Sequence, residues 1–291
     1  MNHYSDQGIS ALLKNHGLRP DKNLGQNFLT DPNIIEKIVR IAGVTSADTV
    51  LEIGAGLGHL TAQLAGSARE VTAVEIDRRF IPILTERLSG FPNITLVEGD
   101  ILQLDSGKLI KQDGYLVVAN IPYYITSRII RKLLEAERKP REIILTIQDE
   151  VARRVCAPAG SLSLLALSVL MYGSPTLEMR IPAGAFYPRP KVDSAVVKID
   201  LHSHPLLPDP QRDTFFQLIK AGFLHKRKTL RNSLSKGLGW STDQASELLT
   251  SGGVDPGRRA ETLSIQEWLE LTDAYDKIGQ SVNPISHQNK D

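Results

Sequence analysis

Short apolar segments alternate with amphipathic segments along most of the chain. Runs rich in Val, Ile, Leu and Ala predict buried strands at 49–53, 71–75, 94–97, 115–119, 143–147 and 195–199. The amphipathic segments between them predict helices at 34–41, 60–65, 80–88 and 127–137. This alternation is typical of an α/β fold, in which helices cover both faces of a mostly parallel sheet.

The pattern changes after residue 201. A segment with three prolines, 202–210, indicates a linker, and four amphipathic segments follow it at 212–224, 229–234, 242–249 and 265–275. Near the other end, Asp31 and Pro32 suit the N-cap and first position of a helix. We therefore expect an N-terminal arm over 1–31, an α/β domain over 32–204, a helical domain over 205–280 and a disordered tail over 281–291.

Length and composition narrow the class of protein. A chain of 291 residues can form one large domain and a small one, and 41% apolar with 23% charged residues is ordinary for a soluble protein. The absence of a secretory signal pattern and of a membrane-spanning apolar run predicts a cytoplasmic protein without a membrane partner. Cys156 is the only cysteine, which excludes an intrachain disulfide, and no Cys/His spacing suits a metal site.

The net charge of +1 conceals an uneven distribution. Residues 211–240 contain seven basic residues and one acidic residue, a net charge of +6, whereas residues 241–291 carry −5. A basic block on a nearly neutral chain favours binding of a polyanion such as nucleic acid. Lys226, Arg227, Lys228 and Arg231 are the candidate phosphate contacts, and the alternative is a solvated helix face.

A glycine-rich turn follows the first predicted strand. Gly54, Gly56 and Gly58 form a GxGxG pattern between a strand and a helix, where glycines let the backbone approach a ligand closely. A dinucleotide fingerprint would place its last glycine where His59 stands, which disfavours a nicotinamide-dependent dehydrogenase. Glu52, just before the turn, favours a ligand without phosphates, and the alternative is a turn that only packs a helix on a strand.

The next two predicted strands end in acids. Glu75 lies nineteen residues beyond Gly56, close to the ~20-residue spacing at which an acid reaches ribose hydroxyls. Its carboxylate can accept hydrogen bonds from both hydroxyls of a cis-diol. Asp100 can accept from an adenine amino group, whereas Asp77 is expected to be exposed. Together the turn and the acids predict a crevice for an adenosine with a free ribose, although a strand-ending acid is often only a surface residue.

Asn120, Ile121, Pro122 and Tyr123 follow the fourth predicted strand, at an edge where open α/β sheets bind ligands. An amide and a flat ring there suit a planar group with an amino substituent, such as adenine. Pro122 restricts Ile121 to an extended conformation, which fixes the direction of the segment. The alternative for Tyr123 is an ordinary core aromatic.

In this order, the motifs resemble a class I S-adenosylmethionine-dependent methyltransferase of the N6-adenine type. More narrowly, the chain resembles the ribosomal RNA small-subunit adenine N6,N6-dimethyltransferase family. The matching segments lie between about residues 22 and 261, at 24–29, 51–58, 75–77, 99–100, 120–127, 186–197 and 227–232. Their joint occurrence is specific, whereas the glycine turn alone is not.

The resemblance implies a Rossmann-like domain with a seven-stranded sheet, a small helical domain and S-adenosyl-L-methionine as cofactor. The cofactor contacts that it implies are Asn27, Leu29, Gly54, Gly56, Glu75, Asp100 and Asn120. Asn120 and the Ile121 carbonyl, held by Pro122, would accept the N6 hydrogens of the target adenine. Tyr123 and Phe186 would stack on its two faces. The resemblance does not decide whether the Gln26 side chain contacts RNA or the cofactor.

The implied activity is dimethylation of N6 on two adjacent adenosines in the 3′-terminal hairpin of 16S rRNA. The implied partner is small-subunit rRNA in a pre-ribosomal 30S particle, and the chain is expected to act as a monomer. One alternative is a 23S rRNA adenine N6-methyltransferase that gives macrolide resistance. Another is a ribosome-assembly factor without catalysis.

Overall fold

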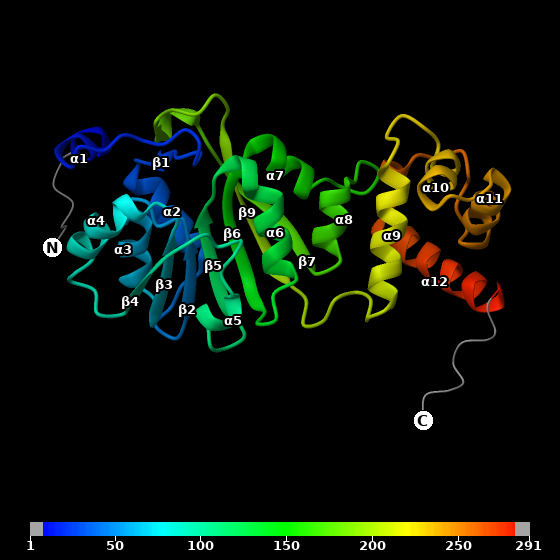
Figure 1. Cartoon of the computed structure of the whole chain (residues 1–291), viewed down its shortest axis with the longest axis horizontal. Coiled ribbons are helices and arrows are strands. Elements are labelled where there is room, and N and C mark those ends of the chain that lie inside the picture. The colour runs from blue at the N-terminus through cyan, green and yellow to red at the C-terminus, as the bar shows by residue number, and fades with distance from the viewer. Residues whose placement is uncertain (1–7, 283–291) are drawn as a thin grey trace. The chain divides into compact units, whose positions relative to one another are not determined.

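A seven-stranded sheet forms the middle of the first part of the protein (Figure 1). In this computed structural model, which describes residues 8–282, the strand order is β4-β3-β2-β5-β6-β9-β7. The strands are β2 Thr49–Ile53, β3 Glu70–Glu75, β4 Ile94–Glu98, β5 Tyr115–Asn120, β6 Pro140–Gln148, β7 Gly173–Ile181 and β9 Ser194–Leu201. The first five pair in parallel, and β9 is antiparallel to β6. The expected α/β fold with a mostly parallel sheet is confirmed.

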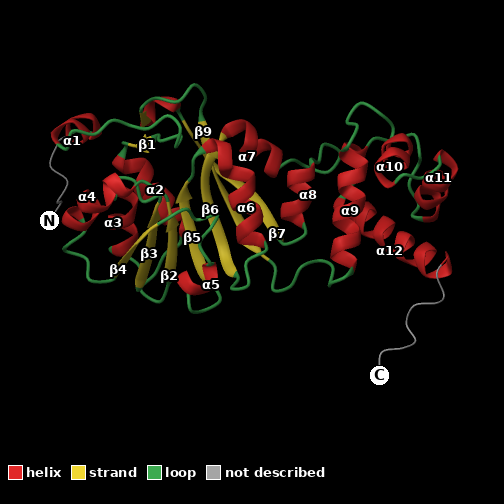
Figure 2. Cartoon of the chain, in the orientation of Figure 1, coloured by secondary structure: helices red, strands yellow, loops and turns green. Residues whose placement is uncertain are grey.

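Helices connect and flank these strands (Figure 2). They are α2 Pro32–Ala42, α3 His59–Ala65, α4 Ile81–Arg87, α5 Ser106–Leu109, α6 Thr126–Leu134 and α7 Asp149–Val155, with a 3₁₀ turn at Arg78–Phe80 before α4. The central strands are apolar without alternation because both of their faces are covered. Val50 and Leu51 on β2 and Val117 and Val118 on β5 are accordingly completely buried.

Helix α2 begins where the sequence predicts it. The Asp31 side chain accepts a hydrogen bond of 2.9 Å from the Asn33 N–H, and Pro32 occupies the first helical position. An N-cap of this kind typically contributes about 1 kcal/mol. Gly43 ends the helix in the left-handed conformation, at φ 58°. Both ends of α2 are thus specified locally.

Three strands are absent from the sequence-based prediction. Strand β7 is mostly exposed along its middle and has Pro175 near its start, so its apolar pattern is weak. Strands β1 Phe28–Leu29 and β8 Phe186–Tyr187 are two residues long and form a separate antiparallel pair. This pair ties the N-terminal arm, which begins with α1 Ile9–Asn15, to a segment more than 150 residues later.

The chain divides into two structural units. The first contains the described residues up to Arg153 together with Ser174–Leu201, and the second contains Arg154–Gly173 and the chain from His202 onward. The sequence alone places 154–173 within the 32–204 domain. Helix α12 continues to Val282, past the expected start of the tail at 281. The rest of that tail, 283–291, and residues 1–7 of the arm lie outside the described residues.

The second unit consists of helices. They are α8 Leu164–Leu170, α9 Gln211–Phe223, α10 Leu230–Leu238, α11 Thr242–Ser251 and α12 Ile265–Val282. Trp268 is completely buried and stacks on Phe223 with ring centroids 6.1 Å apart. Helices α9 and α10 approach so closely that a Cβ at Gly237 would lie 2.6 Å from the Ala221 backbone. The expected helical region is therefore present, with a glycine at this close helix contact.

Residues 8–282 contain neither a membrane-spanning helix nor a cluster of metal ligands. None of the helices there is long and apolar enough to cross a membrane. The same residues contain no group of three or more His, Cys, Asp or Glu side chains that could hold a metal ion.

Glu52 is an acid inside the sheet. Its side chain has no exposed surface, and neither carboxyl oxygen meets hydrogen-bond geometry with another group of the described chain. Burial raises the pKa of Glu52 to about 8, although the nearby Thr61 hydroxyl opposes the rise, and Glu75 adds a smaller increase. Glu52 is thus a neutral acid at neutral pH, buried in the sheet and absent from the residues that line the cavity described below.

Replacing Glu52 with Gln should remove a pH dependence of stability. In the unfolded chain the acid ionises above its ordinary pKa of 4.5, while in the folded chain it stays protonated up to about pH 8. The contribution of Glu52 to the free energy of unfolding should therefore fall between about pH 5 and about pH 8, by about 1.4 kcal/mol for each pH unit that separates the two pKa values. Urea denaturation should show that Glu52→Gln lacks this fall, whereas exposed Glu98→Gln keeps it. Equal slopes for Glu52→Gln and the parent would contradict a buried neutral acid.

Candidate active site

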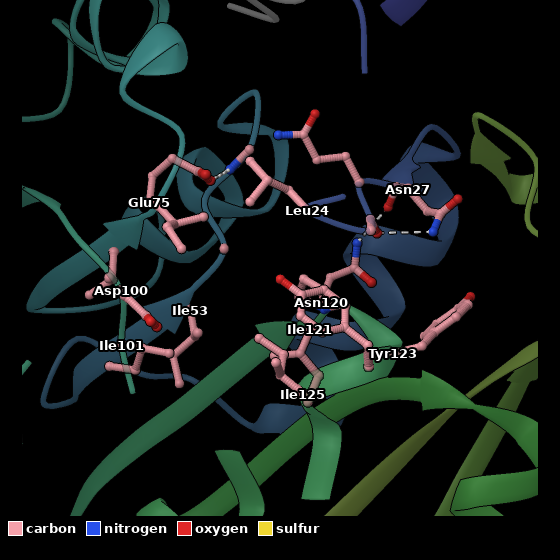
Figure 3. A pocket seen from close by; sticks show the side chains of 18 of the residues that line it. Leu24, Asn27, Ile53, Glu75, Asp100, Ile101, Asn120, Ile121, Tyr123 and Ile125 are labelled. Atoms are coloured by element: carbon pink, nitrogen blue, oxygen red, sulfur yellow. Dashed lines mark hydrogen bonds between the residues drawn. The ribbon is translucent and has the colours of Figure 1, made fainter. Parts of the chain in front are cut away.

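A cavity opens at the carboxyl ends of β2, β3, β4 and β5 (Figure 3), the edge at which parallel sheets bind ligands. The empty space between its lining residues is about 780 Å³, open solvent at the mouth included. The lining residues are Leu24–Phe28, Ile53, Gly54, Gly56, Val74–Ile76, Phe80, Gly99–Ile101 and Asn120–Ile125. The three acid- or glycine-bearing strand ends and the Asn-Ile-Pro-Tyr segment therefore meet in one place, as the sequence predicts.

The glycine turn brings backbone to the floor of the cavity. At Gly54 (φ 83°) a Cβ would lie 3.3 Å from the Asn120 carbonyl oxygen. At Gly56 (φ 58°) a Cβ would lie 3.2 Å from the ring of Phe28. Both positions combine a left-handed backbone with close neighbours, so a side chain at either would be strained and would narrow the cavity.

Glu75 is held rigidly at the end of β3. One carboxyl oxygen, Oε2, accepts from the Gly56 N–H at 2.7 Å, and Oε1 accepts from the Asp77 N–H at 2.8 Å. The side chain is only 5% exposed, and burial raises the pKa of Glu75 while these two N–H donors oppose the rise. Each oxygen keeps a second lone pair that a ligand hydroxyl could use.

Asp100 follows β4 on the same rim of the cavity. Its Oδ1 accepts from the Leu102 N–H at 2.9 Å, whereas Oδ2 has no hydrogen bond within the described part of the chain. The Gly99 N–H donates to the Glu75 carbonyl at 2.8 Å, which ties the ends of β3 and β4 together. Ile76 and Ile101, each next to one of these acids, also line the cavity and supply apolar walls that the sequence prediction does not include.

The orientation of the Asn120 amide follows from its partner. Asn120 Nδ2 lies 3.1 Å from the Asn27 main-chain oxygen. A carbonyl oxygen only accepts hydrogen bonds, so the NH₂ group must face Asn27, and Oδ1 is the other end of the amide. Figure 3 shows this bond between the arm and the end of β5.

Tyr123 also lines the cavity. Its hydroxyl forms a 2.8 Å hydrogen bond with the Ser194 hydroxyl on β9, and burial raises the pKa of the phenol. Tyr124 lines the cavity too and is 60% exposed, with its ring close enough that a Cβ at Gly25 would contact it at 3.3 Å. Tyr123 is therefore fixed by its hydroxyl, while Tyr124 lies at the mouth.

Two predicted site residues lie elsewhere. Leu29 and Phe186 face each other across the β1–β8 pair and are 6% and 4% exposed, and neither lines the cavity. Asn27, by contrast, lines the cavity, and its side chain donates to the Gly25 carbonyl at 3.1 Å. The arm thus contacts the cavity through residues 24–28, while Leu29 anchors it.

Asp77 is buried, contrary to the expectation that it is exposed. It is 5% exposed because its carboxylate accepts from the Arg79 side chain, at 2.6 and 2.8 Å, and from Gln26 at 2.8 Å. These bonds, led by Arg79, lower the pKa of Asp77, so it is an anion at neutral pH. The sequence does not indicate this burial, because one of the two partners, Gln26, is fifty-one residues away.

The four basic candidates belong to the second unit. Lys226, Arg227 and Lys228 are exposed between α9 and α10, and Arg231 is exposed in the first turn of α10. No ion pair involving these four side chains occurs among residues 8–282. They form an exposed basic segment.

The model of one protein family matches nearly the whole chain. The family is described as ribosomal RNA adenine dimethylase, and the match covers residues 17–277. A protein of Dehalococcoides mccartyi named ribosomal RNA small subunit methyltransferase A is 44% identical over 265 residues, 91% of each chain. The protein of that name from Pelotomaculum thermopropionicum is 41% identical over 284 residues, 93% of this chain and 96% of the relative.

Solved structures show the same fold. A dimethyladenosine transferase from Plasmodium falciparum superposes with a TM-score of 0.75 at 28% identity, over 87% of this chain and 98% of that one. The 23S rRNA methyltransferase ErmE superposes with a TM-score of 0.70 at 30% identity, over 86% of this chain and all of that one. Together with the family match, these likenesses show that the chain belongs to the ribosomal RNA adenine dimethylase family.

Proposed function

We propose that this protein transfers methyl groups from S-adenosyl-L-methionine to N6 of two adjacent adenosines in the 3′-terminal hairpin of 16S rRNA. The observation that supports this most is the orientation of the Asn120 amide, whose NH₂ group donates to the Asn27 carbonyl. The same cavity is lined by two acids, Glu75 and Asp100. The names of relatives 41–44% identical to this chain favour small-subunit rRNA as the substrate.

The cofactor suits the cavity. Gly54 and Gly56 leave room for a ligand where any side chain would contact Asn120 or Phe28. Glu75, with one free lone pair on each oxygen, is placed for the ribose hydroxyls, and Asp100 Oδ2 is placed for an adenine amino group. Class I methyltransferases of this family use S-adenosyl-L-methionine, which supplies an electrophilic methyl group on a sulfonium.

The chain's own residues would prepare the nucleophile. The lone pair of an adenine N6 is delocalised into the ring, so the amine is a poor nucleophile until it becomes pyramidal. Asn120 Oδ1 and the Ile121 carbonyl can accept its two N–H bonds and aim the lone pair at the methyl carbon. An amine so oriented would accept the methyl group that the sulfonium supplies, leaving a neutral thioether, and the cationic amine would then lose its proton to water. No general base is required, and orientation supplies most of the effect.

Stacking would hold the base, which must leave its helix to enter the cavity. Tyr123 lines the cavity and is fixed by Ser194, and a base stacked on an aromatic ring is worth ~1–3 kcal/mol. Phe186 is a buried residue of the β1–β8 pair and does not line the cavity, so it could cover the second face only after its ring turned toward the cavity. The proposal therefore rests on Tyr123 for stacking.

The exposed basic segment would contact the RNA backbone. Two adjacent target nucleotides must be presented in turn, which favours a folded RNA within a pre-ribosomal 30S particle as the substrate. We propose that the protein acts on it as a monomer in the cytoplasm.

The likeness to ErmE favours large-subunit rRNA as the second candidate substrate. Mapping the methylated nucleotides distinguishes small-subunit from large-subunit rRNA as the substrate.

Methyl transfer can be mapped with labelled S-adenosylmethionine. Small subunits lacking the modification should take up label in the 3′-terminal hairpin, and digestion should release N6,N6-dimethyladenosine. Asn120→Ala should lose turnover by at least about a hundredfold, because the base would no longer be oriented, while cofactor affinity changes a few-fold at most.

The outcomes separate the candidate functions. Label in large subunits only would support the 23S alternative. No label in either RNA, with the protein still binding small subunits, would support an assembly factor without catalysis. Loss of cofactor binding or of folding in Asn120→Ala would mean that Asn120 is structural.

The basic segment can be tested through the salt dependence of RNA binding. Single substitutions Lys226→Ala, Arg227→Ala, Lys228→Ala and Arg231→Ala should each weaken binding and lower the slope of log K against log salt by about 1 per lost phosphate contact. Arg40→Ala is the control, because this exposed guanidinium is already paired with Glu36 at 2.7 Å. Parental slopes in all four variants, measured by filter binding, would exclude phosphate contacts at this segment.

A further inference from the structure

A short segment of the arm, residues 21–29, lies along one side of the cavity, and we call it the strap. Five consecutive strap residues, 24–28, line the cavity. One end is anchored by the β1–β8 pair and by Phe28, whose ring packs edge-on against Phe80 at a centroid distance of 5.5 Å. The other end must be held by something else, because that part of the strap has no strand partner.

Gln26 supplies that second attachment. Its Oε1 accepts from the Asp21 N–H at 2.7 Å, which closes a loop within the strap. Its Nε2 donates to Asp77 Oδ2 at 2.8 Å, which joins the strap to the segment after β3. Both ends of the amide are therefore engaged within the protein. The sequence leaves Gln26 open between RNA and cofactor, and these two bonds favour a third role within the protein, although Gln26 also lines the cavity.

Asp77 is an unusually firm partner for such a bond. Arg79 binds the same carboxylate through Nε at 2.8 Å and Nη2 at 2.6 Å. The Asp77 N–H in turn donates to Glu75 Oε1 at 2.8 Å. The strap is thus connected, through Gln26 and Asp77, to the acid proposed to bind the ribose.

The residue after Gln26 reaches the other side of the cavity. The Asn27 carbonyl accepts from Asn120 Nδ2, and the Asn27 side chain donates to the Gly25 carbonyl, which stiffens the turn between them. If Gln26 were released, the Asn27 carbonyl would lose its fixed position, and the Asn120 amide could turn over. An inverted amide would present its NH₂ group, instead of an acceptor, to the N6 hydrogens.

We propose that Gln26 and Asp77 form a latch that holds the Asn27 carbonyl against Asn120 and thereby fixes Asn120 Oδ1 as the acceptor for the target amine. Gln26 is then a positioning residue for methyl transfer. The inference rests on the proposed role of Asn120. It also links the two halves of the cavity, since the same latch joins the ribose acid to the amide that orients the target base.

Substitutions of Gln26 should separate turnover from binding. In Gln26→Ala we expect kcat to fall about tenfold to a hundredfold, since a small misplacement of an orienting group has effects of this size. The KM for the small subunit and its direct binding should stay at the parental values. Gln63→Ala, an exposed glutamine on α3, is the matched control and should keep the parental kcat.

A reversed pair supplies the decisive comparison. Gln26→Glu alone places two carboxylates together and should lower kcat at least as much as Gln26→Ala. Combining it with Asp77→Asn restores the hydrogen bond with its direction reversed, from the new amide at position 77 to the new carboxylate at position 26. In this double variant kcat should recover by about tenfold over Gln26→Glu. The effects of the two single substitutions on kcat should therefore not add. The double variant remains informative even if Gln26→Ala lowers the free energy of unfolding. A double variant that recovers the parental stability without recovering kcat would refute a positioning role for Gln26.

Other outcomes would overturn the latch specifically. A parental kcat in Gln26→Ala, with Asn120→Ala inactive, would leave the role of Asn120 intact and remove the latch. A raised KM for the small subunit with unchanged kcat would make Gln26 an RNA contact instead. Full activity in Asn120→Ala would mean that the proposed site itself is wrong, whatever Gln26 does.

Discussion

The parallel register of β2 with its two neighbours determines where every polar group of the cavity lies. Ile53 pairs with Val74 of β3 and with Ala119 of β5. The next residues along these strands, Gly54, Glu75 and Asn120, therefore reach the same edge at the same level. A slip of one residue in either pairing would turn Glu75 or Asn120 to the opposite face of the sheet. Such a slip would also displace side chains that are closely packed on both faces of these buried strands.

Two buried acids at this edge differ in how far their charged forms are stabilised. Glu52 has no exposed surface and no partner of hydrogen-bond geometry in the described chain, so it stays neutral. Glu75 is nearly as buried, yet two backbone N–H groups, from Gly56 and Asp77, stabilise its charged form. The carboxyl proposed to bind the ribose is thus supported by the turn and by the segment after β3, while the carboxyl of Glu52 is not. The glycine turn serves both purposes, since it leaves space for a ligand and supplies a donor.

Much of this arrangement is readable from the sequence, because local signals specify it. The six predicted strands lie within a few residues of β2 to β6 and β9, and Asp31 caps α2 as expected. Gly54, Gly56, Glu75, Asp100 and the Asn120–Tyr123 segment all line the cavity. These residues follow strands directly, so knowing the strands places them.

The features that sequence reasoning misses depend on contacts between distant segments. The β1–β8 pair is two residues long on each side, too short for a periodic pattern, and it removes Leu29 and Phe186 from the cavity lining. Asp77 looks like an exposed turn residue, but Gln26, fifty-one residues earlier, covers it. The bond from Asn120 to Asn27 spans ninety-three residues and has no local signal at all. Such contacts decide how the strap lies and how the Asn120 amide is turned.

A crystal structure of the protein with a non-reactive S-adenosylmethionine analogue would test whether these groups form one site. We expect the ribose hydroxyls on Glu75, the adenine between Ile76 and Ile101 with its amino group at Asp100, and the donor end of the analogue directed toward Asn120 Oδ1. Hydrogen bonds of about 2.7–3.2 Å should connect the ribose and the adenine to the two acids. An analogue bound outside this cavity, or bound with its donor end turned away from Asn120, would contradict the arrangement described above.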